Sequence, residues 1–142
     1  MINGANGNAK PIISARDLHK RFMMGDNEVH ALKGIDLDIH AGQFIGIMGP
    51  SGSGKSTLMY LLGGLDIPTG GTVAVQGQRL DLLSNQDLAH FRGQMVGFVF
   101  QNYQLIGSMN ALENAALPGI FFGLTRDERE ERAYRLLRML RM

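Results

Sequence analysis

The sequence predicts an α/β fold in which a glycine-rich loop joins a buried β-strand to an α-helix. Gln43–Met48 is a short apolar run that ends at a glycine, as a buried parallel strand does. Gly49–Thr57 reads Gly-Pro-Ser-Gly-Ser-Gly-Lys-Ser-Thr. Ser56–Leu62 is apolar and compatible with a helix, which Gly63 and Gly64 would end. The order strand, loop, helix is the context in which a loop of this kind binds phosphate.

The loop matches the pattern G-x-x-x-x-G-K-[ST], which predicts a nucleoside triphosphate and magnesium as ligands. Its glycines allow a tight turn that directs successive backbone N–H groups toward one point. Lys55 is expected to contact the β- and γ-phosphates, and the Ser56 hydroxyl to bind magnesium. A turn without a ligand would need neither of these side chains. The candidate nucleotide-binding residues of the loop are Gly49, Pro50, Ser51, Gly52, Ser53, Gly54, Lys55, Ser56 and Thr57.

Composition is typical of a globular domain. The 142 residues are enough for one domain, and 44% are hydrophobic and 19% charged. A net charge of +1 gives no reason to expect nucleic acid as a partner. The absence of cysteine excludes disulfides and cysteine-based zinc sites, and no apolar stretch reaches the ~18 residues of a membrane span. We expect a flexible tail over residues 1–11, rich in Gly and Asn, and one domain over residues 12–142.

Further strands and turns follow from alternation and from turn-forming residues. Strands are predicted over Ile12–Phe22, Val29–Ile39 and Thr72–Gln76, and a second buried parallel strand over Met95–Phe100. Turns are predicted at Gly25–Asn27, Ala41–Gly42 and Pro68–Gly71.

Two further helices are predicted. One starts at Ser84–Asp87 and continues to Arg92. The other begins with a capping box formed by Thr125 and Glu128. Its predicted apolar face consists of Ala133, Leu136, Leu137 and Leu140, and its predicted ion pairs are Glu128–Arg132 and Glu131–Arg135. Because no glycine, proline or cap precedes Met142, we expect this helix to run to the last residue and the domain to be truncated.

Several motifs around the loop resemble those of ABC transporter ATPases. Phe22, after Leu18-His-Lys-Arg, is similar to the aromatic residue of their A-loop, and Gln101 to the glutamine of their Q-loop. The segments Leu65–Gly70, Leu112–Asn114 and Leu117–Pro118 also fit the family. Together they resemble the LolD/MacB-type branch, which serves lipoprotein release and macrolide or peptide export. The resemblance extends from about Ile12 to Met142.

The resemblance implies a P-loop NTPase of the ABC ATPase type, with an antiparallel β subdomain, an incomplete parallel core sheet and helices. It implies ATP and Mg²⁺ as cofactors. Phe22 would stack on adenine, and the alternative is a packed aromatic at a strand end. Gln101, unless it is an ordinary polar residue after a strand, would reach the magnesium and the attacking water. The candidate catalytic residues are thus Lys55 and Gln101, and the candidate magnesium ligands Ser56 and Gln101.

The stretch after Gln101 has two open interpretations. The side chains of Tyr103, Leu105 and Ile106 would line the groove in which the membrane subunit's coupling helix docks, or they would belong to an internal core. The resemblance also implies a transmembrane permease and a second ATPase subunit as partners. It places the protein on the cytoplasmic face of the inner membrane.

Three family elements are absent from the 142 residues: a Leu-Ser-Gly-Gly-Gln signature, a strand ending in Asp-Glu after the loop, and a switch histidine. The four histidines are expected at the surface or in turns: His19, His30, His40 and His90. We therefore predict ATP binding without efficient hydrolysis, in a domain of marginal stability. The alternatives are a non-catalytic nucleotide-binding remnant of a truncated gene and a P-loop small-molecule kinase.

Overall fold

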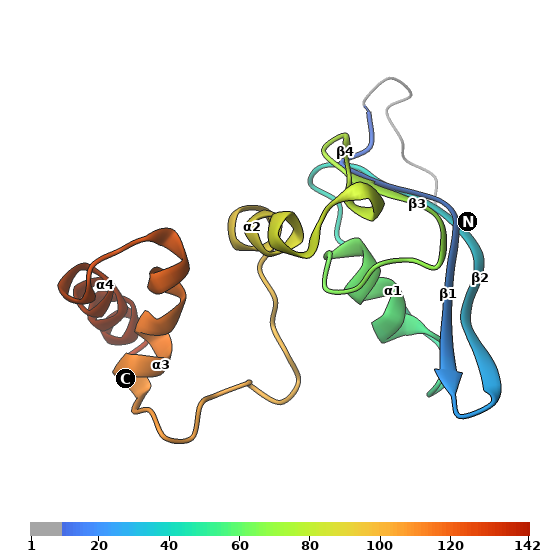
Figure 1. Cartoon of the computed structure of the whole chain (residues 1–142). Coiled ribbons are helices and arrows are strands. Elements are labelled where there is room, and N and C mark those ends of the chain that lie inside the picture. The colour runs from blue at the N-terminus through green and yellow to red at the C-terminus, as the bar shows by residue number, and fades with distance from the viewer. Residues whose placement is uncertain (1–9) are drawn as a thin grey trace. The chain divides into compact units, whose positions relative to one another are not determined.

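A computed structural model describes residues 10–142, which form two compact units that divide after Gln94 (Figure 1). Residues 1–9 of the predicted tail lie outside the described part. Ile12, the residue directly after the predicted tail, belongs to the fold, since its N–H donates to the carbonyl of Ile39 at 2.7 Å. The single domain over residues 12–142 stays a prediction.

The first unit is built on an antiparallel sheet in the order β2-β1-β3-β4. Strands β1 (Ile13–Met24) and β2 (Asn27–Ile39) form a long hairpin, and β3 (Gly70–Val75) pairs with the other edge of β1 (Figure 1). The short β4 (Gln78–Arg79) follows β3. These strands confirm the three predicted from alternation. The hairpin extends two residues further on each side than predicted, up to the turn at Gly25 and Asp26.

Helix α1 (Lys55–Leu62) packs on this sheet and contacts β1, β2 and β3. It ends where Gly63 and Gly64 predicted, with Gly64 in the left-handed conformation at φ 68°. The 3₁₀ turn η1 (Leu80–Leu82) and α2 (Asn85–Met95) complete the unit. Burial of each large side chain in this core contributes on the order of 1.5–3 kcal/mol. The core consists of Ala15, Leu18, Leu32, Leu61, Leu62, Val73, Val75, Leu80, Leu88 and Phe91.

The two predicted parallel strands are wrong for the described residues. Gln43–Met48 and residues 96–100 have no strand structure, and Met95 is the last residue of α2. Phe44 and Val99 are fully exposed. An apolar run becomes a buried strand only when neighbouring strands satisfy its backbone and helices cover its faces. The only sheet among residues 10–142 is the antiparallel one, in which neither segment takes part.

The turn predicted at Pro68–Gly71 ends early, because β3 already begins at Gly70. Gly71 has a φ of 74°, beside a register shift between Arg16 and His19 of β1. A Cβ at this position would lie 2.0 Å from the carbonyl oxygen of Asp17. The glycine therefore permits close contact between two paired strands rather than a turn.

The second unit is helical. It contains α3 (Ala111–Ala116), the 3₁₀ segment η2 (Leu117–Phe122) and α4 (Arg126–Met139). The predicted capping box at the start of α4 is confirmed, since Thr125 accepts the N–H of Glu128 and the Glu128 carboxylate accepts the N–H of Thr125. A second capping box, formed by Asn110 and Glu113, begins α3.

The predicted run of α4 to the last residue is wrong. The helix ends at Met139, and Arg141 adopts the left-handed conformation with φ 59°. The N–H of Met142 then donates to the carbonyl of Leu137 at 3.0 Å, which closes the last turn without a glycine.

The surface of α4 follows the prediction in part. Of its predicted apolar face, Ala133 is buried whereas Leu136 and Leu140 are exposed. The Glu131–Arg135 pair forms at 3.4 Å. The Glu128–Arg132 pair is not observed, because the Glu128 carboxylate is taken up by the cap; Arg126 pairs with Glu130 instead, at 2.6 Å. Among residues 10–142, no helix combines the length and apolar character that crossing a bilayer requires.

Candidate functional site

The glycine-rich loop leads directly into α1. Gly54 is the N-cap of the helix, with φ 85° and ψ 4°, and Gly52 has a φ of 77°. Left-handed positions alternating with ordinary ones turn successive N–H groups toward the same side of the chain. Among residues 10–142, a Cβ at Gly52 would meet no atom within 4 Å. Gly52 and Gly54 thus have the left-handed conformations that a phosphate-binding loop uses.

Gly54 lies against an irregularity in β2. The pairing of β1 with β2 passes from Lys20↔Leu32 to Arg21↔His30, which leaves Ala31 as the extra residue of a bulge. A Cβ at Gly54 would be 2.5 Å from the carbonyl oxygen of Ala31. Only glycine can therefore begin α1 this close to the sheet. Ala31 was not predicted from the sequence, because bulge positions carry no residue signature here.

The start of α1 is suited to an anion. The first intrahelical bond runs from the N–H of Leu58 to the carbonyl of Gly54, at 2.8 Å, so the earlier N–H groups have no intrahelical acceptor. The first turn contains no acidic residue that would compete for them. The exposed Ser56 lies in this turn. These donors and the positive end of the helix dipole favour phosphate binding.

The Lys55 side chain bends back over the loop. Its ammonium donates to the carbonyl of Pro50 at 2.7 Å and to that of Gly49 at 3.0 Å. The charged group that is predicted to bind phosphate is thus already beside the phosphate loop. A phosphate oxygen would replace weak neutral acceptors with a charged one.

Phe22 lies near the end of β1, where 40% of its surface is exposed. The ammonium of Lys20 lies 5.1 Å from the ring centroid. The prediction assigned no role to Lys20. The signal was available, because residues two apart on a strand share a face.

Gln101 is exposed in a turn of the second unit, so its relation to the phosphate loop stays a prediction. Tyr103, Leu105 and Ile106 are 84%, 69% and 39% exposed. None of the three lies in a core, which contradicts the internal-core interpretation for the described residues.

The predicted placement of the histidines at the surface or in turns holds for His30 and His90, which are exposed. His19 is half-buried and its Nε2 lies 2.8 Å from the Asp17 carboxylate. His40, also half-buried, lies just before the turn at Ala41.

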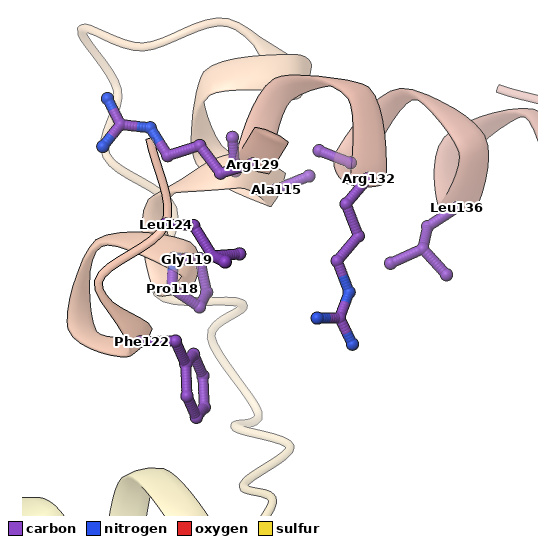
Figure 2. Close-up of a pocket in the computed structure, with 10 residues that line it drawn as sticks. Ala115, Pro118, Gly119, Phe122, Leu124, Arg129, Arg132 and Leu136 are labelled. Atoms are coloured by element: carbon purple, nitrogen blue, oxygen red, sulfur yellow. The ribbon is translucent and has the colours of Figure 1, made fainter. Parts of the chain in front are cut away.

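The second unit contains a pocket of about 330 Å³ between η2, α3 and α4 (Figure 2). The Arg132 guanidinium extends on the same side as the side chains of Phe122 and Leu136, whereas the head of Arg129 points away from them. The lining of the pocket is mainly apolar and includes Gly119. A Cβ added to Gly119 would lie 2.6 Å from the Cβ of Arg129. The groups expected around a triphosphate, the glycine-rich loop and Lys55, lie in the first unit.

Comparison with known proteins identifies the family of the chain. The family model described as ABC transporter matches residues 32–142. The macrolide export ATP-binding/permease protein MacB of Aggregatibacter actinomycetemcomitans is 47% identical over 91% of this chain and 20% of its own length. The pyoverdine export ATP-binding/permease protein PvdT of Pseudomonas fluorescens (strain Pf0-1) is 49% identical over 92% of this chain and 20% of its own length.

Two shorter proteins extend the comparison. The uncharacterized ABC transporter ATP-binding protein YknY of Bacillus subtilis (strain 168) is 44% identical over 89% of this chain and 55% of its own length. The solved dimeric, post-hydrolysis structure of the ATP-binding cassette MJ0796, bound to ADP and Pi, superposes with a TM-score of 0.82 at 39% identity. That match covers 92% of this chain and 57% of the cassette.

The chain spans 20% of the length of the two fused export relatives and 55–57% of the two shorter proteins. Over that span the chain matches the family model across residues 32–142 and the solved cassette with a TM-score of 0.82. The chain therefore belongs to the ABC transporter family and has the fold of its ATP-binding domain.

Proposed function

We propose that the chain is the ATP-binding part of a MacB-like ABC export transporter. The observation that carries the proposal is the loop Gly49–Thr57, which leads into α1 against the β2 bulge and has the Lys55 ammonium lying beside it. The family match, and the ADP and Pi bound to the solved cassette, support a nucleotide as ligand.

The residues fit ATP and Mg²⁺ in distinct roles. The loop backbone and Lys55 would hold the β- and γ-phosphates, and the Ser56 hydroxyl would be a ligand of Mg²⁺. Bound Mg²⁺ neutralises the phosphate oxygens. Phe22 would stack on adenine through its exposed surface, and Gln101 would contact Mg²⁺ and orient the attacking water.

The proposed partners follow from the relatives. MacB and PvdT are named as ATP-binding/permease proteins, which supports a transmembrane permease as partner. The solved cassette is dimeric, which supports a second ATPase subunit. The proposed location is the cytoplasmic face of the inner membrane, and the proposed cargo is an exported small molecule. Release of lipoproteins is the alternative cargo, and nucleic acid is not proposed as a partner.

We expect these 142 residues to bind ATP without efficient hydrolysis, because they contain neither the signature motif nor the acidic strand end that follows the loop in the family. A non-catalytic nucleotide-binding remnant is the second interpretation, and the same binding loop supports it. The small-molecule kinase is not retained, because the family match extends through most of the chain.

Titration calorimetry of the purified chain with ATP and Mg²⁺ tests the proposal. We expect saturable binding that Lys55→Ala weakens by at least an order of magnitude, as loss of a charge-assisted contact requires. Absence of binding by the folded chain would refute ATP binding. A robust ATPase rate that Lys55→Ala abolishes would refute the predicted lack of hydrolysis.

A further inference from the structure

Lys20 is a charged residue in the interior of the first unit. Only 11% of its side chain is exposed, and it comes from the middle of β1. Its ammonium donates to the Asp66 carboxylate and to the carbonyl of Ile67, both at 2.7 Å. Both acceptors belong to the loop between α1 and β3. A buried ammonium is tolerated only when it is paired in this way.

The same ammonium lies over the Phe22 ring, at 5.1 Å from its centroid. An ammonium has three N–H donors, and the bonds to Asp66 and Ile67 leave one of them free. A cation at this distance is attracted to the ring face. Lys20 thus occupies one face of the ring, while 40% of the Phe22 surface remains exposed.

The attachment of the loop to β1 does not depend on Lys20 alone. The N–H of Thr69 donates to the carbonyl of His19 at 2.9 Å, and the N–H of Arg21 donates to the Thr69 hydroxyl at 3.1 Å. Asp66 also accepts the N–H of Ile67 at 2.7 Å. The two bonds of Thr69 join strand and loop without Lys20, so the contact of the ammonium with the Phe22 ring can be tested separately from the attachment of the loop.

The geometry points to Lys20 as a positioning residue for the nucleotide base. Held by Asp66 and Ile67, its ammonium fixes the orientation of the Phe22 ring and leaves the opposite face for adenine. The inference rests on the proposed function, since it requires that Phe22 stacks on the base. It adds that the stacking surface is set by the loop after α1, the helix that carries the phosphate loop.

The test compares a ligand that has a base with one that lacks it. Titration calorimetry of the 142-residue chain measures the affinities for ATP and for inorganic tripolyphosphate, each with Mg²⁺. We expect Lys20→Met to weaken ATP binding about two- to tenfold, the range of a cation–ring contact, and to leave tripolyphosphate binding unchanged. Lys33→Met removes an exposed lysine of β2 and should change neither affinity.

A double-mutant cycle separates positioning from a general structural effect. In a Phe22→Ala background, Lys20→Met should weaken ATP binding no further. Equal losses for ATP and tripolyphosphate, or additive losses in the cycle, would overturn the inference. If Lys20→Met does not fold by circular dichroism, Asp66→Asn decides in its place, since it keeps the ammonium but loosens its anchor. Failure of the unaltered chain to bind either ligand would instead refute the proposed function.

Discussion

Gly54 of the phosphate loop lies against the backbone of Ala31 in the antiparallel sheet. The space for a Cβ on Gly54 is taken by the Ala31 carbonyl oxygen, 2.5 Å away. The loop is therefore positioned by the bulge of β2 as well as by its own sequence. The loop makes this contact although the segment before it, Gln43–Met48, is not a strand.

Gly54→Ala should disrupt the site more than Gly52→Ala. Both glycines have a positive φ, 85° and 77°, so both substitutions cost about 1 kcal/mol in backbone strain. Only the Cβ at Gly54 also meets the Ala31 carbonyl, while the one at Gly52 meets nothing within 4 Å. We expect the melting temperature and ATP affinity to fall further for Gly54→Ala. Equal effects of the two substitutions would contradict the role of the bulge.

Lys55→Met should separate ligand binding from stability. Within the described residues the ammonium bonds only to the loop carbonyls of Gly49 and Pro50, and Lys55 is half-exposed, so its loss should change the free energy of unfolding by less than about 1 kcal/mol. ATP affinity should fall at least tenfold, because the charge-assisted contact to phosphate is lost. Thermal melts with and without ATP measure both. A large loss of stability without nucleotide would show that the lysine is chiefly structural.

The stability of the second unit should depend on pH through Glu128. Hydrogen bonds from the Thr125 hydroxyl and then from its backbone N–H hold the pKa of Glu128 below its usual range. Because the folded pKa is lowered, the stabilisation is present above the unfolded value of ~4.3 and is lost as pH falls through the folded pKa. The helical signal at 222 nm, followed in melts from about pH 6 to about pH 3, measures this loss.

Glu128→Gln is the matched control, since it keeps an acceptor in the cap but does not titrate. Other carboxylates titrate equally in both proteins, so the difference in pH dependence belongs to Glu128. Parallel curves for the two proteins would contradict the prediction.

Gly119→Ala should destabilise the second unit by about 1–3 kcal/mol, the usual cost of overpacking. The added Cβ would lie 2.6 Å from the Cβ of Arg129, which is fixed to the backbone of α4 and cannot move aside alone. Gly107→Ala in the same unit meets no atom within 4 Å and is the control. Chemical denaturation followed by circular dichroism measures both. A destabilisation by Gly107→Ala as large as that by Gly119→Ala would count against the clash.

Local signals in the sequence predicted much of the fold. Alternation predicted β1 and β2, and Gly64 and the Thr125–Glu128 box predicted helix ends, because each rests on contacts within a few residues. The prediction of two parallel strands was wrong, because apolar character does not specify a partner strand and a buried strand needs such a partner. The turn predicted to extend to Gly71 was wrong at that residue, because the sequence does not distinguish a glycine that permits a close contact between strands from a glycine that forms a turn.

Some residues of the candidate site were likewise predictable from the sequence and others were not. The phosphate loop was predictable because the motif is contiguous and its chemistry is local. Ala31 was not predictable, because its importance depends on the register between β1 and β2. Strand alternation places Lys20 on the same face as Phe22, but its contact with Asp66, 46 residues away, was not predictable. The role of Gln101 stays a prediction, because Gln101 belongs to the second unit and the phosphate loop to the first.

The bent-back Lys55 has a consequence for which anions the loop accepts. Its ammonium already has two carbonyl partners, at 2.7 and 3.0 Å, so an incoming ion must compete with acceptors supplied by the protein itself. A weakly charged anion gains little binding free energy by displacing these carbonyls, whereas a highly charged triphosphate gains much more. We therefore expect the loop to select anions by charge and to bind a triphosphate in preference to small monovalent anions such as chloride.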